Sequence, residues 1–405
     1  IAECLVGSEM CIRDSPENNV LRQIWQFLYE GVNRANYMEE NKANIDFEGK
    51  EAMYGEVYFL RAYYYFELVK FFGDVPLFTE ARLTAGQAGT LTRTPKDEVY
   101  AQIELDLQNA IASLPNSQSQ VGRVNKYTAY ALLGKVLLYQ DKFAEAASAL
   151  DNVIGVYSLV SDYGSQFLRF GENGPESVFE IQYSNQSNWY DWGCAHCSEG
   201  NYAIIMNGPR GWSGPEYAQG WSFNVPTEEF YNSFEEGDSR RDATVLDIEA
   251  FAAATGASYT EGYDHTGYFN NKYIPRAGES GGQTELNYLT NFRIIRYSDV
   301  LLMAAEAYNR GGIDDGLAQE FLNQVRRRAF GGDDNDISAS GSALTDAIWE
   351  ERKFELSLEG HRFFDLVRTG RASSLIAGFV EGKHEVFPIP QQEVDISGLT
   401  QNAGY

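Results

Sequence analysis

Basic residues are scarce in this chain of 405 residues. It carries 32 Lys and Arg against 58 Asp and Glu, which gives a formal net charge of −26. Proteins that bind nucleic acids need a basic surface to neutralise phosphates, and docking on an anionic membrane needs the same sign of charge. No apolar run approaches the roughly 18 residues that a membrane-spanning helix requires. The composition therefore argues against nucleic-acid binding, electrostatic membrane docking and bilayer-spanning segments.

Cysteine and histidine are also rare. The four cysteines, at positions 4, 11, 194 and 197, are too few to form a disulfide scaffold in a chain of this length. Cys194-Ala195-His196-Cys197 offers three soft metal ligands, but no second Cys/His pair supplies the fourth position of a tetrahedral zinc site. We therefore predict no metal and no cofactor, and we interpret Cys194 and Cys197 as a local loop disulfide or a free thiol pair.

The first fifteen residues, IAECLVGSEMCIRDS, differ in character from the rest of the chain. They do not begin with Met, and acidic residues interrupt any apolar stretch that a secretion signal would need. The string resembles a translated sequencing-adapter read. We interpret residues 1–15 as a sequence artefact, and we expect the native N-terminus, with its signal peptide and lipidated cysteine, to be missing from this chain.

Apolar residues recur at helical spacing near both ends of the chain. Residues 47–72 carry an apolar face with spacings of three and four, which predicts a long helix that Gly73 ends. Thr94-Pro95 has the form of a side-chain cap followed by a first-turn proline, and predicts a helix that continues to Pro115.

Two segments look like helix–turn–helix pairs of the tetratricopeptide kind. They cover residues 128–154 and 297–325, and the first places Ala131, Gly134 and Ala146 where two helices must approach closely. Stacked pairs of this kind bury a continuous core between neighbours. The fold class we predict is all-α dominated: a tetratricopeptide-like helical repeat scaffold with a loop-rich ligand-binding insertion.

The middle of the chain has a different composition. Between residues 156 and 292, Gly, Asn, Ser, Tyr and Trp dominate and helical periodicity is weak. We predict a loop-rich ligand-binding region there, between an N-terminal part of the helical scaffold at 16–155 and a C-terminal part at 293–405. A rigid scaffold that carries variable loops is typical of a binding protein.

No set of residues predicts catalysis. The segment 278–282, GESGG, fits the pattern of a hydrolase nucleophile, but no buried strand precedes it, so we interpret it as a loop. The acidic run 333–336 lacks the Gly and distal Glu of a calcium loop, and we interpret it as a solvated connection between helices. A glycoside hydrolase would need two carboxylates among the loop aromatics, where only Asp191, Glu199 and Glu216 lie nearby.

Charged residues follow helical spacing from Glu351 to Arg368. They begin on a further helix that we predict over residues 346–360. Oppositely charged side chains three or four positions apart stabilise a helix modestly. We interpret these residues as a structural ion-pair ladder.

The aromatic residues of the loop region are the best candidates for a binding site. Flat rings stack on the C–H faces of sugars, while amide and guanidinium groups bind sugar hydroxyls. We predict that ligand affinity resides in segment 184–217. The predicted ligand-binding residues are Trp189, Tyr190, Trp192, Asn201, Tyr202, Arg210, Trp212 and Tyr217. We interpret Trp221 as loop packing, because Trp221-x-Phe223-x-Val225-Pro226 leads directly into a helix.

Several segments together resemble the SusD/RagB family of Bacteroidetes outer-membrane nutrient-binding lipoproteins. The resemblance covers about residues 20–405. The segments that carry it, besides the helix pair at 128–154, are YFLRAYYYFELVKFFGDVPL (58–77), VPTEEFYNSFEEGDSRRDATV (225–245), FRIIRYSDVLLMAAEAYNRGG (292–312), IWEERKFELSLEGHRFFDLVRTGRA (348–372) and FPIPQQEVDISGLTQNAGY (387–405).

The resemblance implies a non-catalytic protein on the surface of the outer membrane. It implies a lipid anchor as the only membrane attachment, and a SusC-like TonB-dependent transporter as the partner over which the protein closes. It also implies an oligosaccharide ligand that is captured for import. A peptide ligand and a tetratricopeptide scaffold for protein partners are the alternatives that remain open at this point.

Overall fold

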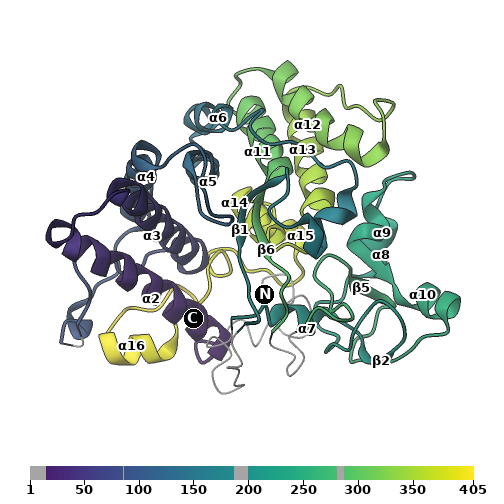
Figure 1. Ribbon diagram of the computed structural model, residues 1–405, viewed down its shortest axis with the longest axis horizontal. Helices are drawn as coiled ribbons and strands as arrows, with labels where there is room; N and C mark the ends of the chain where they lie inside the picture. Colours follow the sequence, from purple (N-terminus) through teal and green to yellow (C-terminus); the bar gives the residue numbers. More distant parts are fainter. Residues whose placement is uncertain (1–14, 85, 187–198, 281–286) are drawn as a thin grey trace. The chain divides into compact units, whose positions relative to one another are not determined.

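The chain divides into two compact units. A computed structural model describes residues 15–84, 86–186, 199–280 and 287–405. The central unit consists of Ile154–Arg362, and the terminal unit consists of the described residues up to Val153 together with Phe363–Tyr405. Helices dominate both, and the strands of the described residues form two-stranded sheets (Figure 1). The predicted all-α dominated fold is confirmed.

The terminal unit begins with a series of helices, each of which packs against the next (Figure 1). They are α2 (Asn19–Asn41), α3 (Lys50–Phe72), α4 (Lys96–Ser113), α5 (Lys126–Leu138) and α6 (Phe143–Asp151). The C-terminal stretch adds α14 (Arg362–Arg368), α15 (Ala372–Leu375) and α16 (Gln391–Ser397). The predicted helix over 47–72 is confirmed as α3, and Gly73 follows it with the left-handed φ of 71° that ends a helix.

A buried ion pair joins α3 to α4. The Arg61 guanidinium donates from Nε and Nη2 to the two carboxylate oxygens of Asp106, both at 2.7 Å. Both side chains are almost fully buried, at 5% and 1% exposed. Arg61 Nη1 also donates to the Thr79 carbonyl at 2.7 Å and to the Asn36 amide oxygen at 3.0 Å, which brings the hydrogen bonds of the guanidinium to four. Each buried charge is thus paired and hydrogen-bonded, as burial requires.

The start of α4 differs from the sequence prediction. The helix begins at Lys96, and the side chain of Thr94 does not cap it. Thr94 instead forms an antiparallel bridge with Val75, and the Lys96 N–H donates to Asp74 Oδ1 at 2.8 Å. A carboxylate from a distant turn therefore satisfies the helix end, which the local pattern of Thr94-Pro95 does not reveal.

The two predicted tetratricopeptide-like pairs are confirmed as helix pairs. The first is α5 with α6 in the terminal unit, and the second is α11 (Tyr297–Arg310) with α12 (Asp315–Phe330) in the central unit. A Cβ atom added to Gly134 of α5 would lie 2.5 Å from the side chain of Leu150 on α6. The glycine is therefore required by the close approach of the two helices.

The central unit combines α11 and α12 with a third long helix and a set of short elements (Figure 1). The third helix, α13 (Gly341–Glu355), packs against α11 and α12. The antiparallel strand pairs are β1 (Ser177–Ile181) with β6 (Phe292–Arg296), β2 (Arg210–Ser213) with β4 (Ser258–Thr260), and β3 (Val245–Asp247) with β5 (Tyr268–Asn270). The short helices are α7 (Ala203–Asn207), α8 (Glu228–Asn232), α9 (Arg240–Thr244) and α10 (Ile248–Thr255).

Helix α13 ends earlier than the sequence predicts. It stops at Glu355, and the chain turns through Leu358 and Gly360, which have φ values of 63° and 82°. This turn breaks the helical spacing that the charged residues from Glu351 to Arg368 follow. The residues do form structural ion pairs, as predicted, and Asp365 pairs with Arg368 three positions later. The predicted ladder is wrong for Glu351, Glu355 and Glu359, which pair with arginines from other elements of the central unit.

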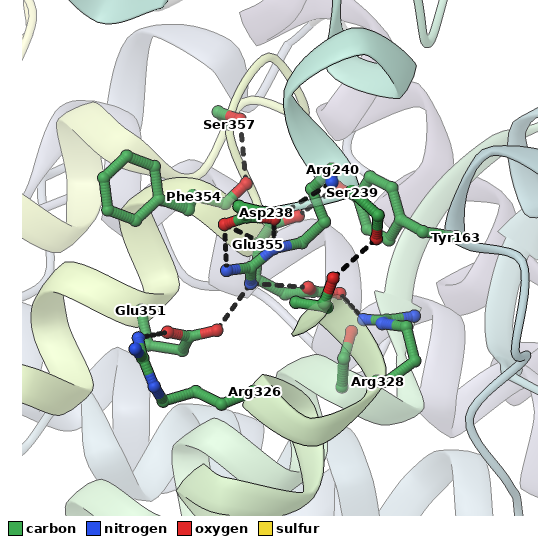
Figure 2. Close-up of polar contacts among 12 residues, drawn as sticks. Tyr163, Asp238, Ser239, Arg240, Arg326, Arg328, Glu351, Phe354, Glu355 and Ser357 are labelled. Atoms are coloured by element: carbon green, nitrogen blue, oxygen red, sulfur yellow. Dashed lines mark hydrogen bonds and ion pairs between the residues drawn. The ribbon is translucent and has the colours of Figure 1, made fainter. Parts of the chain in front are cut away.

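These residues form the buried charge cluster of the central unit. It contains five cations, Arg240, Arg296, Arg326, Arg328 and Lys272, and five carboxylates, Glu176, Asp238, Glu351, Glu355 and Glu359. Figure 2 shows Arg240 between Asp238, Glu351 and Glu355. Equal numbers of both signs leave the cluster neutral, which is the condition under which so many charges are tolerated in an interior.

The cluster also satisfies the end of α13. The Glu355 carbonyl accepts from Tyr163 Oη at 2.7 Å, from Arg296 Nη2 at 2.9 Å and from Lys272 Nζ at 3.1 Å, while the Ser357 carbonyl accepts from Lys272 at 2.8 Å. The last carbonyls of a helix carry partial negative charge and lack intrahelical partners. Burial lowers the pKa of Lys272 to about 8, although Glu359 acts in the opposite direction.

Candidate functional site

The loop region of the central unit is ordered by a backbone crossing between segments 205–210 and 220–223. The N–H groups of Gly220, Trp221, Ser222 and Phe223 donate to the carbonyls of Pro209, Ile205, Gly208 and Met206, at 2.8 to 2.9 Å. Strand β2 follows this crossing directly and pairs with β4, with Arg210 opposite Thr260. The crossing therefore fixes the backbone positions at both ends of segment 210–224.

Two glycines make this crossing possible. A Cβ atom added to Gly220 would lie 2.3 Å from the Cα of Gly208 and 2.5 Å from its N and C atoms. These are backbone atoms, which cannot rotate away as a side chain would. Glycine is therefore required at this position by the contact of two backbones.

Apolar clusters hold the loops on the rest of the unit. Trp221 packs against a buried cluster that includes Tyr163, Phe167 and Tyr273. This confirms the interpretation of Trp221 as loop packing. Trp212 and Phe251 pack against a second cluster, which includes Tyr217 and Phe269.

Two of the predicted ligand residues lie at the start of α7. Asn201 is buried, its amide donates to the Thr290 carbonyl at 2.9 Å, and its amide oxygen accepts from the Ala203 N–H at 3.2 Å. A ligand contact by Asn201 would require these bonds to break. Tyr202 is half-buried, and burial raises the pKa of its hydroxyl, so it is neutral at physiological pH and able to donate a hydrogen bond.

Trp212 and Tyr217 lie together in the second cluster. Their rings meet edge to face at 5.9 Å, and both contact Phe251. Tyr217 is 5% exposed, and its hydroxyl donates to Asn271 Oδ1 at 3.3 Å, which leaves little of the ring for a ligand. Trp212 is half-buried, and its indole N–H has no hydrogen-bond partner among the described residues.

Arg210 is exposed at the start of β2. Its Nε donates to the Trp221 carbonyl at 2.6 Å, and its guanidinium carbon lies 5.7 Å from the centre of the Phe223 ring. The bond to Trp221 uses Nε and so restrains the guanidinium. A planar group with several fixed donors suits the hydroxyls of a polar ligand.

The remaining predicted contacts lie outside the described residues. They are Trp189, Tyr190 and Trp192. Asp191 and the group of Cys194, His196 and Cys197, which the sequence analysis weighed for other roles, also lie outside them. The same holds for Gly281 and Gly282 of the hydrolase-like pattern, whereas Ser280 forms an isolated bridge with Tyr288. Elsewhere in the described chain, no three His, Cys, Asp or Glu side chains gather into a group able to hold a metal ion. No helix within the described ranges is long and apolar enough to cross a membrane.

Sequence reasoning missed two exposed rings on these loops. Phe223 is 47% exposed and Tyr263 is 83% exposed. Both are followed by residues with positive φ, Asn224 at 53° and Asp264 at 53°. Asn and Asp directly after an aromatic residue are a turn signal, and that signal was available in the sequence.

Comparisons with known proteins identify the family. A model described as the SusD family matches residues 175–378, and a second, described as starch-binding and associating with the outer membrane, matches residues 9–138. The SusD-like protein P2 of Formosa agariphila is 29% identical over 422 residues, which cover 96% of this chain and 81% of that protein.

Solved structures agree with this. The chain is 38% identical to a laminarin binding SusD-like protein, with a TM-score of 0.85 over 95% of this chain and 86% of that one. It is 31% identical to the surface glycan-binding protein A from Bacteroides thetaiotaomicron in complex with laminarihexaose, with a TM-score of 0.83 over 94% and 85% of the two chains. The chain belongs to the SusD family of outer-membrane-associated glycan-binding proteins, which confirms the predicted family and its non-catalytic role.

Proposed function

We propose that this protein captures a neutral glucan of the laminarin type at the cell surface and delivers it for import without cleaving it. The observation that carries the proposal is the 38% identity, over 95% of this chain, to a laminarin binding SusD-like protein. The net charge of −26 supports a neutral ligand over a polyanionic one.

The ligand face, in this proposal, is the loop region of the central unit. Trp189, Tyr190 and Trp192 supply stacking rings, while Tyr202 and Arg210 supply hydroxyl and guanidinium donors. Trp212 contributes its half-buried indole ring. Asn201 and Tyr217 hold the loop backbone in place rather than contact the glycan, because their own side chains are buried and hydrogen-bonded.

Titration with laminarihexaose tests the ligand and the rings together. We expect the wild-type protein to bind the hexasaccharide and to return it uncleaved, as judged by chromatography of the mixture. Trp189→Ala and Trp192→Ala each remove a stacking ring, worth about 1–2 kcal/mol of apolar burial, or roughly 5- to 30-fold in affinity. Tyr37→Ala, which removes a ring that is 47% exposed on α2, is the matched control. Unchanged affinity in both Trp variants would move the site elsewhere, and hydrolysis of the glycan would contradict the non-catalytic role.

The proposal includes a partner and an anchor. A SusC-like TonB-dependent transporter receives the glycan, and an N-terminal lipid holds the protein on the outer membrane. We expect the native lipoprotein, co-expressed with its cognate SusC-like barrel, to co-purify with that barrel in detergent. Recovery of the monomer alone, from membranes that contain the barrel in excess, would contradict this part of the proposal.

A further inference from the structure

The two exposed rings that sequence reasoning missed lie on loops that contact each other. Phe223 follows Ser222, and Tyr263 follows Gly262. A Cβ atom added to Gly262 would lie 2.9 Å from the Cβ of Ser222, so the two loops meet at these residues. Phe223 and Tyr263 are therefore the residues that directly follow this contact, one on each loop.

Arg210 lies close to the contact between Ser222 and Gly262. It pairs with Thr260 across β2 and β4, two residues before Gly262, and its N–H donates to Ser222 Oγ at 3.1 Å. Its guanidinium stands 5.7 Å from the centre of the Phe223 ring. The guanidinium and the Phe223 ring therefore lie together, and the strand pair and the loop contact place the backbone that carries Tyr263 next to them.

The backbone around the rings is held in an unfavourable conformation. Ser222, Asn224 and Asp264 have φ values of 59°, 53° and 53°, in the left-handed region that L-residues rarely adopt. Hydrogen bonds maintain it: the Ser222 and Phe223 N–H groups donate to the Gly208 and Met206 carbonyls, both at 2.8 Å. Residues in such conformations concentrate at ligand-binding positions, where the surrounding structure determines them.

Trp221 supports the Phe223 ring. Trp221 meets Phe223 edge to face at 6.1 Å, and Trp221 itself packs on the buried cluster of Tyr163 and Tyr273. The ring is thus braced by the protein on one edge while nearly half of its surface remains in water. A phenyl ring kept exposed in this way has lost the apolar burial that packing would give it, unless a ligand covers it.

We propose that Phe223 and Tyr263 form, with Arg210, a carbohydrate subsite that adds two rings to the predicted ligand residues and is used by the same glycan. This rests on the proposed function. A sugar ring covers one aromatic face, whereas a protein partner would need a continuous apolar patch of several side chains. Arg210 donates from its terminal N–H groups to the sugar hydroxyls, and its pairing with Trp221 keeps the guanidinium beside the ring.

Binding of laminarin and laminarihexaose to single variants tests the subsite. We expect Phe223→Ala and Tyr263→Ala each to weaken laminarin binding by about 5- to 30-fold, since each removes one stacking ring. The melting temperature should stay at the wild-type value, because both rings are exposed and their loss leaves no cavity. Phe170→Ala is the matched control, since it removes a ring that is 78% exposed in the same unit but on a different segment.

The outcomes separate this subsite from the proposed function. Wild-type binding with unchanged affinity in both Phe223→Ala and Tyr263→Ala would overturn the subsite and leave the proposed function standing. An equal loss in Phe170→Ala would also overturn it, because the effect would then belong to exposed rings in general. A wild-type protein that binds neither glycan would overturn the proposed function and the subsite with it.

Discussion

Replacing Arg240 by Met is expected to lower the free energy of unfolding by about 3–5 kcal/mol, the effect of removing one partner from a buried ion pair. Arg240 is fully buried and serves three carboxylates at once. It binds Asp238 in bidentate fashion at 2.9 and 2.7 Å, Glu351 at 2.5 Å and Glu355 at 3.2 Å (Figure 2). Methionine fills similar space, so the loss comes from uncompensated negative charge rather than from a cavity.

The loss should depend on pH. Burial alone would raise the pKa of Glu355, but the guanidinium groups of Arg328, Arg296 and Arg240 outweigh it and hold that pKa well below its ordinary value. The stability that these pairs contribute is complete above the ordinary carboxyl pKa and is lost as pH falls through the lowered one. In Arg240→Met the pKa of Glu355 rises, and protonation relieves the unpaired charge. The difference from wild type should therefore narrow as pH is lowered from 7 toward 4.

Urea unfolding at a series of pH values measures this. Arg241→Met is the matched control, because Arg241 is the next residue, is exposed, and pairs with the exposed Asp242 at 2.9 Å. We expect the control to change stability by less than about 1 kcal/mol at every pH. A loss in Arg240→Met that does not exceed that of Arg241→Met would show that the buried charge cluster contributes no net stability.

The charged residues show where local pattern fails. Helical spacing predicted a ladder from Glu351 to Arg368, yet Arg240, Arg296 and Arg326 are the actual partners of its glutamates. Arg240 lies 111 residues before Glu351 in the chain. Nothing in a local window identifies partners at that separation, and the turn at Leu358 lets Glu355 and Glu359 reach the same arginine.

The helix pairs show where local pattern succeeds. Apolar periodicity and small residues specify α5 with α6, because both partners lie in one short segment and meet at Gly134 and Leu150. The aromatic loops fall between these cases. Composition alone identified the region, but it does not distinguish the buried ring of Tyr217 from the exposed rings of Phe223 and Tyr263. That distinction depends on non-local contacts, such as the backbone hydrogen bonds between segments 205–210 and 220–223. A local sequence pattern does not contain them.

Replacing Gly220 by Ala at this crossing is expected to reduce glycan affinity by more than tenfold. The added Cβ atom would overlap the backbone of Gly208, whose Cα would lie at 2.3 Å. Overpacking of a well-packed site typically costs about 1–3 kcal/mol, and the upper end applies because backbone atoms have no alternative rotamer. Relief requires the crossing to open, which breaks the bonds from Trp221 and Ser222 to Ile205 and Gly208.

In Gly220→Ala, opening of the crossing would reduce the fraction of molecules in which the ligand face is intact. Affinity falls in proportion to that fraction, and about 3 kcal/mol corresponds to roughly 100-fold in the equilibrium between closed and open crossings. The buried charge cluster and the helix pairs do not include Gly220, so the far-ultraviolet circular dichroism should remain that of a folded helical protein. Limited proteolysis should gain cleavage within residues 205–224.

Gly332→Ala is the control for this variant, because no atom lies within 4 Å of the Cβ it would add. Gly332 is exposed beyond the end of α12, so the substitution changes neither packing nor the loops. Titration with laminarihexaose should then give the wild-type affinity for Gly332→Ala and a much weaker one for Gly220→Ala. If Gly220→Ala binds as wild type does and resists protease equally, the crossing does not organise the ligand face. The glycan contacts would then lie on elements that the crossing does not hold, which would also remove the support for placing Arg210 and Phe223 among them.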